Sequence, residues 1–180
     1  METLKWLRKE QCIWDKATCR HAAEGGHLEV LKWARENGCK WDSTQCCGIA
    51  AQSGHLHVLQ WAITTGCEFE ALYVLQLAAK RGHQHILEWL GDRYDLKELE
   101  TVCVHAAHGG HLQLLKWLCE TIGCEVKTED VCTVAAKKGH FSVLQYAREA
   151  NSPLNDEKVC IAAARGSLGN TRMGGEDATM

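Results

Sequence analysis

Cysteine and histidine are the residue types with the greatest potential for chemistry in this chain, with 11 and 10 copies among 180 residues. The most suggestive spacing is Cys103-x-His105-x2-His108-x2-His111, in which His105 and His108 share one face of a predicted helix. Zinc would need four such nitrogen and sulfur ligands to converge at about 2.0–2.3 Å. This cluster is therefore the strongest candidate for a metal site.

A structural explanation competes with metal or redox chemistry. Cys103 and Cys47 occupy the same position of a motif, C-x-x-A-A-x-x-G-H, that recurs along the chain, and His111 lies beyond a Gly-Gly turn. The vicinal pair Cys46-Cys47 could be a redox or metal element, but Cys47 is one of the repeated residues. We predict no bound metal and no cofactor, and keep a metal- or redox-responsive module as an alternative function.

The sequence argues against several other classes of protein. No P-loop, glycine-rich dinucleotide loop, nucleophile elbow or paired-carboxylate arrangement occurs, so we expect a protein that is not an enzyme. The formal net charge of −3 gives no support for a nucleic-acid partner. Apolar stretches stay below the roughly 18 residues of a membrane span, and the charged start does not fit a signal peptide. These features predict an intracellular protein, cytoplasmic or nuclear, with no membrane partner.

The recurring motif defines the organisation of the chain. Its five copies lie at residues 19–27, 47–55, 75–83, 103–111 and 132–140, with Leu75 in place of the Cys in the third. They follow one another at steps of 28, 28, 28 and 29 residues, and Cys160 begins a sixth copy that lacks the Gly-His. A period of this size predicts a stacked repeat array, in which each unit buries its apolar face against its neighbours.

Each repeat is predicted to form two helices, which we name helix A and helix B. In the repeat that begins at Asp15, helix A is expected over about 16–24 and helix B over about 27–37, from the 3–4 spacing of apolar residues. Asp15 suits the N-cap of helix A. Gly26 is expected to end that helix, because glycine takes a positive φ freely. The Gly-His histidines are predicted to cap helix B and to form hydrogen bonds across the turn between the two helices.

One helix B position carries an aromatic residue in six successive repeats. These residues are Trp6, Trp33, Trp61, Trp89, Trp117 and Tyr146. They share a stripe with Val, Leu and Ala, which predicts a buried ridge between successive repeats. An exposed strip that stacks bases or sugars is the alternative.

The pattern resembles that of ankyrin repeats. Residues 27–39 (HLEVLKWARENGC) match the second half of the family pattern T-P-L-H-x-A-A-x-x-G-H-x-x-V-V-x-x-L-L-x-x-G-A, and Ala22-Ala23 fall on its A-A pair. The T-P-L-H tetrapeptide is missing, and the repeat is about five residues shorter than the family's 33. The shortening falls where family members form a β-hairpin finger. The resemblance implies an all-α, ankyrin-like α-solenoid of stacked helix-turn-helix repeats with shortened or absent β-hairpin fingers.

The predicted organisation has partial repeats at both ends. We expect a partial repeat with helix B alone at 1–14, five full repeats at 15–155, a partial repeat with helix A alone at 156–165 and a flexible tail at 166–180. Neither end carries the polar cap that a solenoid normally has. We therefore expect a fragment or a chain that relies on a partner, with self-association through the uncapped ends.

Most cysteines fall into two columns of equivalent repeat positions. The first column is Cys19, Cys47, Cys103, Cys132 and Cys160, and the second is Cys12, Cys39, Cys67 and Cys124. Equivalent residues of adjacent repeats should lie about 8–10 Å apart, whereas a disulfide needs Cα atoms within about 7 Å. We predict reduced, buried thiols, with pairs between the two columns as a minor alternative.

The predicted partner-binding surface lies on helix A, at positions just after the Cys and just after the Ala pair. In ankyrin family members such positions face the concave groove. Here they are Arg20, His21, Glu24, Ile49, Gln52, Gln76, Leu77, Lys80, Val104, His105, His108, Val134 and Lys137. The middle of this set is apolar through Ile49, Leu77, Val104 and Val134, and an exposed apolar patch usually marks an interface. Ordinary surface, partly buried between helices, is the alternative.

These features predict a non-enzymatic scaffold that binds another protein, of unknown identity, through the concave helix A surface. The metal- or redox-responsive module is one alternative. A substrate-receptor fragment of a ubiquitin ligase is another, by analogy with a role that some ankyrin proteins play.

Overall fold

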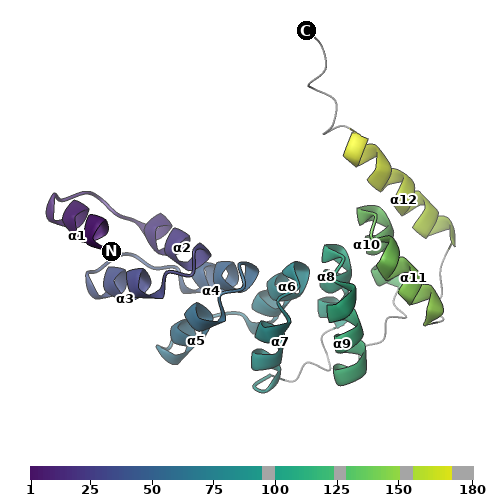
Figure 1. The fold of residues 1–180 in the computed structure, drawn as a ribbon, viewed down its shortest axis with the longest axis horizontal. Helices are drawn as coiled ribbons and strands as arrows, with labels where there is room; N and C mark the ends of the chain where they lie inside the picture. The colour runs from purple at the N-terminus through teal and green to yellow at the C-terminus, as the bar shows by residue number, and fades with distance from the viewer. Residues whose placement is uncertain (95–99, 124–128, 151–155, 172–180) are drawn as a thin grey trace, which may run out of the picture. The chain divides into compact units, whose positions relative to one another are not determined.

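The computed structural model describes residues 1–94, 100–123, 129–150 and 156–171, which form helices joined by turns (Figure 1). The helices are α1 (Glu2–Lys9), α2 (Lys16–Glu24), α3 (Leu28–Glu36), α4 (Ser43–Gln52), α5 (Leu56–Thr64), α6 (Ala71–Arg81), α7 (Gln84–Gly91), α8 (Glu100–Gly109), α9 (Leu112–Ile122), α10 (Glu129–Lys138), α11 (Phe141–Glu149) and α12 (Asp156–Thr171). No strand occurs in these ranges. The all-α fold of paired helices is therefore confirmed, and the described connections carry no β-hairpin finger.

The chain forms two compact units, Met1–Ala78 and Ala79–Met180, whose boundary falls within α6. In the first unit α2 packs against α3, α4 packs against α5, and α2 lies alongside α4. In the second unit α8 packs against α9, α10 packs against α11, and α10 lies alongside both α8 and α12 (Figure 1). Within each unit, the A helices of successive repeats are thus neighbours.

Small side chains let these A helices approach one another. In α2 the exposed fractions of Cys19, Ala22 and Ala23 are 0%, 5% and 0%. Leu31 and Ala34 of α3 are fully buried in the same cluster. Each repeat therefore contributes a flat, apolar face from helix A and a larger leucine from helix B, as the 3–4 spacing predicts.

The helix ends follow the sequence signals. The Asp15 carboxylate accepts a hydrogen bond from the Ala17 backbone N–H at 2.8 Å, which satisfies a free donor at the start of α2. Gly26 has φ +68° after α2, and Gly38 has φ +76° after α3. Both values lie in the left-handed region, where a side chain is strained. The predicted role of Gly26 as a helix stop is confirmed.

The buried ridge differs from the prediction. Trp6 is 59% exposed and the other five aromatic residues of the predicted ridge are half-buried, whereas Leu31, Leu59, Leu87 and Leu115 of the B helices are 0% exposed. The leucine position, two residues before the aromatic one, therefore forms the buried ridge. The prediction is corrected to this extent: the aromatic residues lie at the rim of the core, where Trp61 packs against it.

The tryptophans instead cover the connections between repeats. Trp33 meets Trp14 edge to face with ring centroids 5.3 Å apart, and Trp61 meets Trp41 in the same way at 5.8 Å. The Arg35 guanidinium lies 5.2 Å above the Trp41 ring. Edge-to-face and cation–π contacts of this kind stabilise half-buried rings at the rim of a core.

The cysteines are mostly free thiols. Nine described cysteines are free, and five of them are buried. The prediction of reduced thiols is wrong at Cys103, which is disulfide-bonded. The spacing argument concerned only equivalent residues of adjacent repeats, so it placed no constraint on a bond between Cys103 and a cysteine outside that column.

The C-terminal helix is longer than the sequence pattern indicates. Helix α12 runs to Thr171, past Arg165, and residues 172–180 of the expected tail lie outside the described ranges. The boundaries of the partial repeats and self-association at the ends stay predictions. Among the described helices, none combines the length and apolar character needed to cross a bilayer.

Candidate functional site

The predicted partner-binding residues all lie on A helices: α2, α4, α6, α8 and α10. Four are exposed, namely His21, Glu24, Lys80 and Lys137. The other nine are half-buried, namely Arg20, Ile49, Gln52, Gln76, Leu77, Val104, His105, His108 and Val134. All of them remain at least partly accessible beside the buried Cys and Ala columns, and their role in binding a partner stays a prediction.

The apolar part of this surface is less open than the sequence suggested. Leu77 leans over α4, where a Cβ added to Gly48 would lie 3.2 Å from its Cδ1 atom and 2.7 Å from Cε1 of Tyr73. Tyr73 is 42% exposed, which makes it the open apolar side chain of this region. The sequence analysis missed Tyr73 because it lies before the motif, although its i, i+4 spacing to Leu77 places both on one helix face.

Two of the predicted histidines bind their own helix. The Nδ1–H of His21 donates to the Ala17 carbonyl at 2.7 Å, and that of His105 donates to the Thr101 carbonyl at 2.7 Å. This tautomer leaves Nε2 as an acceptor, and Arg20 approaches the Nε2 atom of His21 at 3.4 Å. Both rings therefore present an acceptor nitrogen at the helix A surface.

The Gly-His histidines connect successive repeats. His55 donates from Nε2 to the Glu24 carbonyl at 2.9 Å, and His111 donates to the Lys80 carbonyl at 3.1 Å. His140 donates in the same way to the His108 carbonyl at 3.0 Å. These carbonyls lie at the C-terminal ends of A helices, where helical partners are lacking.

The predicted capping role of these histidines is corrected by this arrangement. His55 is the N-cap residue of α5, yet its side chain forms no capping hydrogen bond there. The imidazole reaches the preceding repeat instead. The predicted capping role is therefore wrong for the His55 side chain, which forms its hydrogen bond with the neighbouring repeat.

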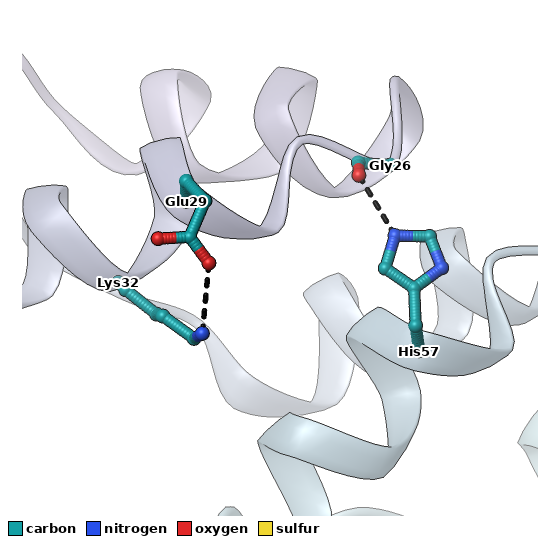
Figure 2. Close-up of polar contacts among 4 residues, drawn as sticks. All are labelled: Gly26, Glu29, Lys32 and His57. Atoms are coloured by element: carbon teal, nitrogen blue, oxygen red, sulfur yellow. Dashed lines mark hydrogen bonds and ion pairs between the residues drawn. The ribbon is translucent and has the colours of Figure 1, made fainter.

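At Gly26, Gly82 and Gly110 the glycine before the histidine makes room for the histidine of the next repeat. A Cβ added to Gly26 would lie 2.6 Å from Nδ1 of His55, and one added to Gly110 would lie 2.5 Å from Nδ1 of His140. Figure 2 shows a second contact of this seam, in which Nε2 of His57 donates to the Gly26 carbonyl at 2.9 Å. The nearby Lys32–Glu29 ion pair, at 2.8 Å, stays within α3 (Figure 2).

A basic hollow lies on the second unit, where A helices end and the Gly-His turns begin. Its volume is about 430 Å³, and none of its lining residues is acidic. Its side chains come from Lys80, Arg81, His108, His111, Lys138 and His140. Sequence reasoning placed Lys80 and His108 on the predicted binding surface and gave His111 and His140 other roles. It missed Arg81 and Lys138 and did not bring these residues together, because it considered each repeat by itself.

The charges around the hollow affect the pKa of His108. Burial lowers the pKa of His108 below its usual value, and the neighbouring Lys138, Lys80, His105 and His140 lower it further. A neutral imidazole is therefore favoured there. The same cations that disfavour a charged His108 would attract an anion.

The candidate metal cluster is not assembled in the structure. Cys103 is disulfide-bonded, the Nδ1 atom of His105 is bound to the Thr101 carbonyl, and Nε2 of His111 is bound to the Lys80 carbonyl. No group of three or more potential metal-binding side chains converges within the described residues.

The vicinal thiols are also poorly suited to redox chemistry. Cys46 and Cys47 are free and buried. Burial raises the pKa of Cys46 to about 11 and that of Cys47 to about 12. The reactive thiolate is then scarce at neutral pH, which favours a structural role in the core.

Two family matches cover most of the described repeats. A family described as "Ankyrin repeats (3 copies)" matches residues 47–130, and one described as "Ankyrin repeats (many copies)" matches residues 19–63. Together they extend over residues 19–130, more than half of the chain. No curated protein matches it.

Proposed function

The chain belongs to the ankyrin-repeat family, whose repeats are generally protein–protein interaction modules. We propose that it acts without catalysis, as a scaffold that binds another protein through the accessible faces of its A helices. The observation that carries this proposal is the contrast along each A helix. Cys19, Ala22 and Ala23 are buried and small, whereas the adjacent positions are accessible and differ from repeat to repeat.

The accessible positions combine several kinds of contact. The first unit offers Glu24, Gln52, Tyr73 and Leu77, which can accept and donate hydrogen bonds and bury apolar area. A tyrosine beside a leucine is a favourable centre for an interface, because aromatic side chains carry a large share of binding energy. The second unit adds the cations of the basic hollow.

The two alternative functions receive no comparable support. The Cys-His cluster is not assembled, and the buried thiols of Cys46 and Cys47 are held in their protonated form. A substrate-receptor role in a ubiquitin ligase rests on analogy alone.

The proposal can be tested by photo-crosslinking with the full chain in a cell extract. A photoreactive residue is placed at Gln52 or Gln76 on A helices, and at Glu29 or Glu88 on B helices as matched controls. We expect the A-helix positions to cross-link one protein that mass spectrometry identifies, and the B-helix positions to leave it unlabelled. Labelling from the B helices alone would contradict the assignment.

A second measurement tests the apolar part of the surface. In the variant with Leu77→Asp and Val104→Asp we expect loss of that cross-link with unchanged helical circular dichroism. A control variant with Ile63→Asp and Leu144→Asp changes half-buried apolar residues of B helices and should keep the cross-link. Equal capture by both variants would show that the partner binds elsewhere.

A further inference from the structure

The two residues that follow the Ala-Ala pair of the motif change in charge along the chain. The successive pairs are Glu24-Gly25, Gln52-Ser53, Lys80-Arg81, His108-Gly109 and Lys137-Lys138. These positions are acidic or neutral in the first unit, whereas the second unit carries four Lys or Arg residues there. The formal net charge of the chain is −3, so this basic edge is a local feature and does not follow from overall composition.

The positive charges around the basic hollow have no carboxylate partner among the residues that line it. In the described part of the chain, Lys80, Arg81 and Lys138 form no salt bridge, and no carboxylate lines the hollow. All three side chains are exposed. Uncompensated like charges around one hollow repel one another, and an anionic ligand would relieve that repulsion.

The carbonyl groups at the helix ends do not neutralise these cations. A helix C-terminus carries partial negative charge on its free carbonyls. Here the Lys80 carbonyl accepts from His111, and the His108 carbonyl accepts from His140. These hydrogen bonds satisfy the carbonyls, so the cationic side chains are available to a ligand.

We propose that the basic hollow binds an extended, acidic segment of the protein partner. The fixed cations are Lys80 and Arg81 at the end of α6 and Lys138 at the end of α10, with the neutral His108 of α8 between them. At about 8–10 Å per repeat these two helix ends are about 16–20 Å apart. An extended chain advances about 3.3 Å per residue, so acidic side chains about six residues apart match this separation. The inference rests on the proposed function and names the chemistry of the partner at this edge.

The spacing favours a peptide over other anions. A single phosphate would meet the cations of one helix end, because the two helix ends that carry them are about 16–20 Å apart. A nucleic acid would meet a chain of net charge −3, which opposes the broad phosphate contacts that such binding requires. Both serve as competitors in the test.

The test uses the full chain and a fluorescent peptide with four Glu-Glu-Ser units, measured by fluorescence anisotropy at low salt. We expect binding that weakens as salt rises. The variant with Lys80→Gln, Arg81→Gln and Lys138→Gln should lose about tenfold in affinity, the sum of three modest exposed ion pairs. A control variant with Lys16→Gln, Lys40→Gln and Arg148→Gln removes the same charges from exposed sites outside the hollow and should bind normally.

A spectroscopic readout ties the binding to the hollow. Added peptide should raise the pKa of His108, followed by NMR, because the carboxylates offset the effect of Lys80 and Lys138. Equal losses in both triple variants, or binding with no change at His108, would overturn the proposal. Displacement of the peptide by equimolar inorganic phosphate or by a single-stranded oligonucleotide would also overturn it.

The two proposals fail in different ways. If the A helices cross-link a partner but the acidic peptide does not bind, the scaffold role stands and the acidic segment is wrong. If the peptide binds the hollow but the A-helix positions capture no partner, the hollow is an anion site and the scaffold role is wrong.

Discussion

The contact between Gly26 and His55 gives the most direct test of how the repeats hold together. Gly26→Ala adds a methyl group to a residue with φ +68°, at a point 2.6 Å from Nδ1 of His55. Gly38→Ala adds the same group at φ +76° with no atom within 4 Å. The two variants share the backbone strain and differ in the displacement of the histidine.

The expected magnitudes follow from these two terms. Left-handed backbone costs a residue with a side chain about 1–2 kcal/mol, which is the whole effect at Gly38. At Gly26 the imidazole must also move, and its hydrogen bond to the Glu24 carbonyl is lost. That loss adds about 0.5–1.5 kcal/mol. We therefore expect Gly26→Ala to lower the free energy of unfolding by about 1 kcal/mol more than Gly38→Ala.

Urea unfolding followed by far-UV circular dichroism measures both variants, together with His55→Ala and its double variant with Gly26→Ala. Because the added methyl group destabilises the protein partly by displacing His55, the double variant should lose less free energy of unfolding than the sum of the two single variants. Equal losses in Gly26→Ala and Gly38→Ala, with additive behaviour in the double variant, would refute the role of the histidine at the seam.

Three further predictions concern the core and the titrating groups. Leu59→Ala should lower the free energy of unfolding by about 2–5 kcal/mol in urea titrations, because Leu59 is 0% exposed. Iodoacetamide at pH 8 should alkylate the exposed Cys12 much faster than the buried Cys47, because burial raises the pKa of Cys47 to about 12. Mass spectrometry measures the extent of alkylation at both sites. NMR titration should give His108 a pKa below its usual value and a higher one in Lys138→Gln. Because the pKa of His108 is lower in the folded state, the unfolded state takes up the proton first as the pH falls. The free energy of unfolding contributed by neutral His108 is therefore present above the unfolded-state pKa and is lost as the pH falls below it. The wild type should lose stability on acidification more steeply than Lys138→Gln.

The features that the sequence predicted correctly are those fixed within one repeat. Helix A and helix B follow from apolar spacing, and the position of Gly26 follows from the conformation that its turn requires. The N-cap at Asp15 likewise depends on residues two positions apart. Local backbone chemistry settles these features, so they can be derived from one copy of the motif.

The features that the sequence did not predict depend on how one repeat lies on the next. The acceptor of His55 is a carbonyl 31 residues earlier, and spacing within a repeat does not show it. The choice of Leu31 over Trp33 for the core depends on how closely neighbouring helices approach. The basic hollow likewise needs the relative positions of three helix ends. Comparing equivalent positions across repeats would have shown the charge change at Lys80, though not the hollow.

The seam between repeats explains why the surface can vary without loss of the fold. His55 binds the backbone carbonyl of Glu24, and the equivalent acceptors are the carbonyls of Lys80 and His108, whose side chains lie on the predicted binding surface. Every residue supplies the same carbonyl, so the side chain at this position is free to change while the hydrogen bond is kept. We therefore expect Glu24→Lys to alter the free energy of unfolding by less than about 0.5 kcal/mol, while His55→Ala, which removes the donor, costs about 0.5–1.5 kcal/mol. Urea unfolding of the two variants measures this difference, and a Glu24→Lys loss as large as that of His55→Ala would show that the side chain of residue 24 takes part in the seam.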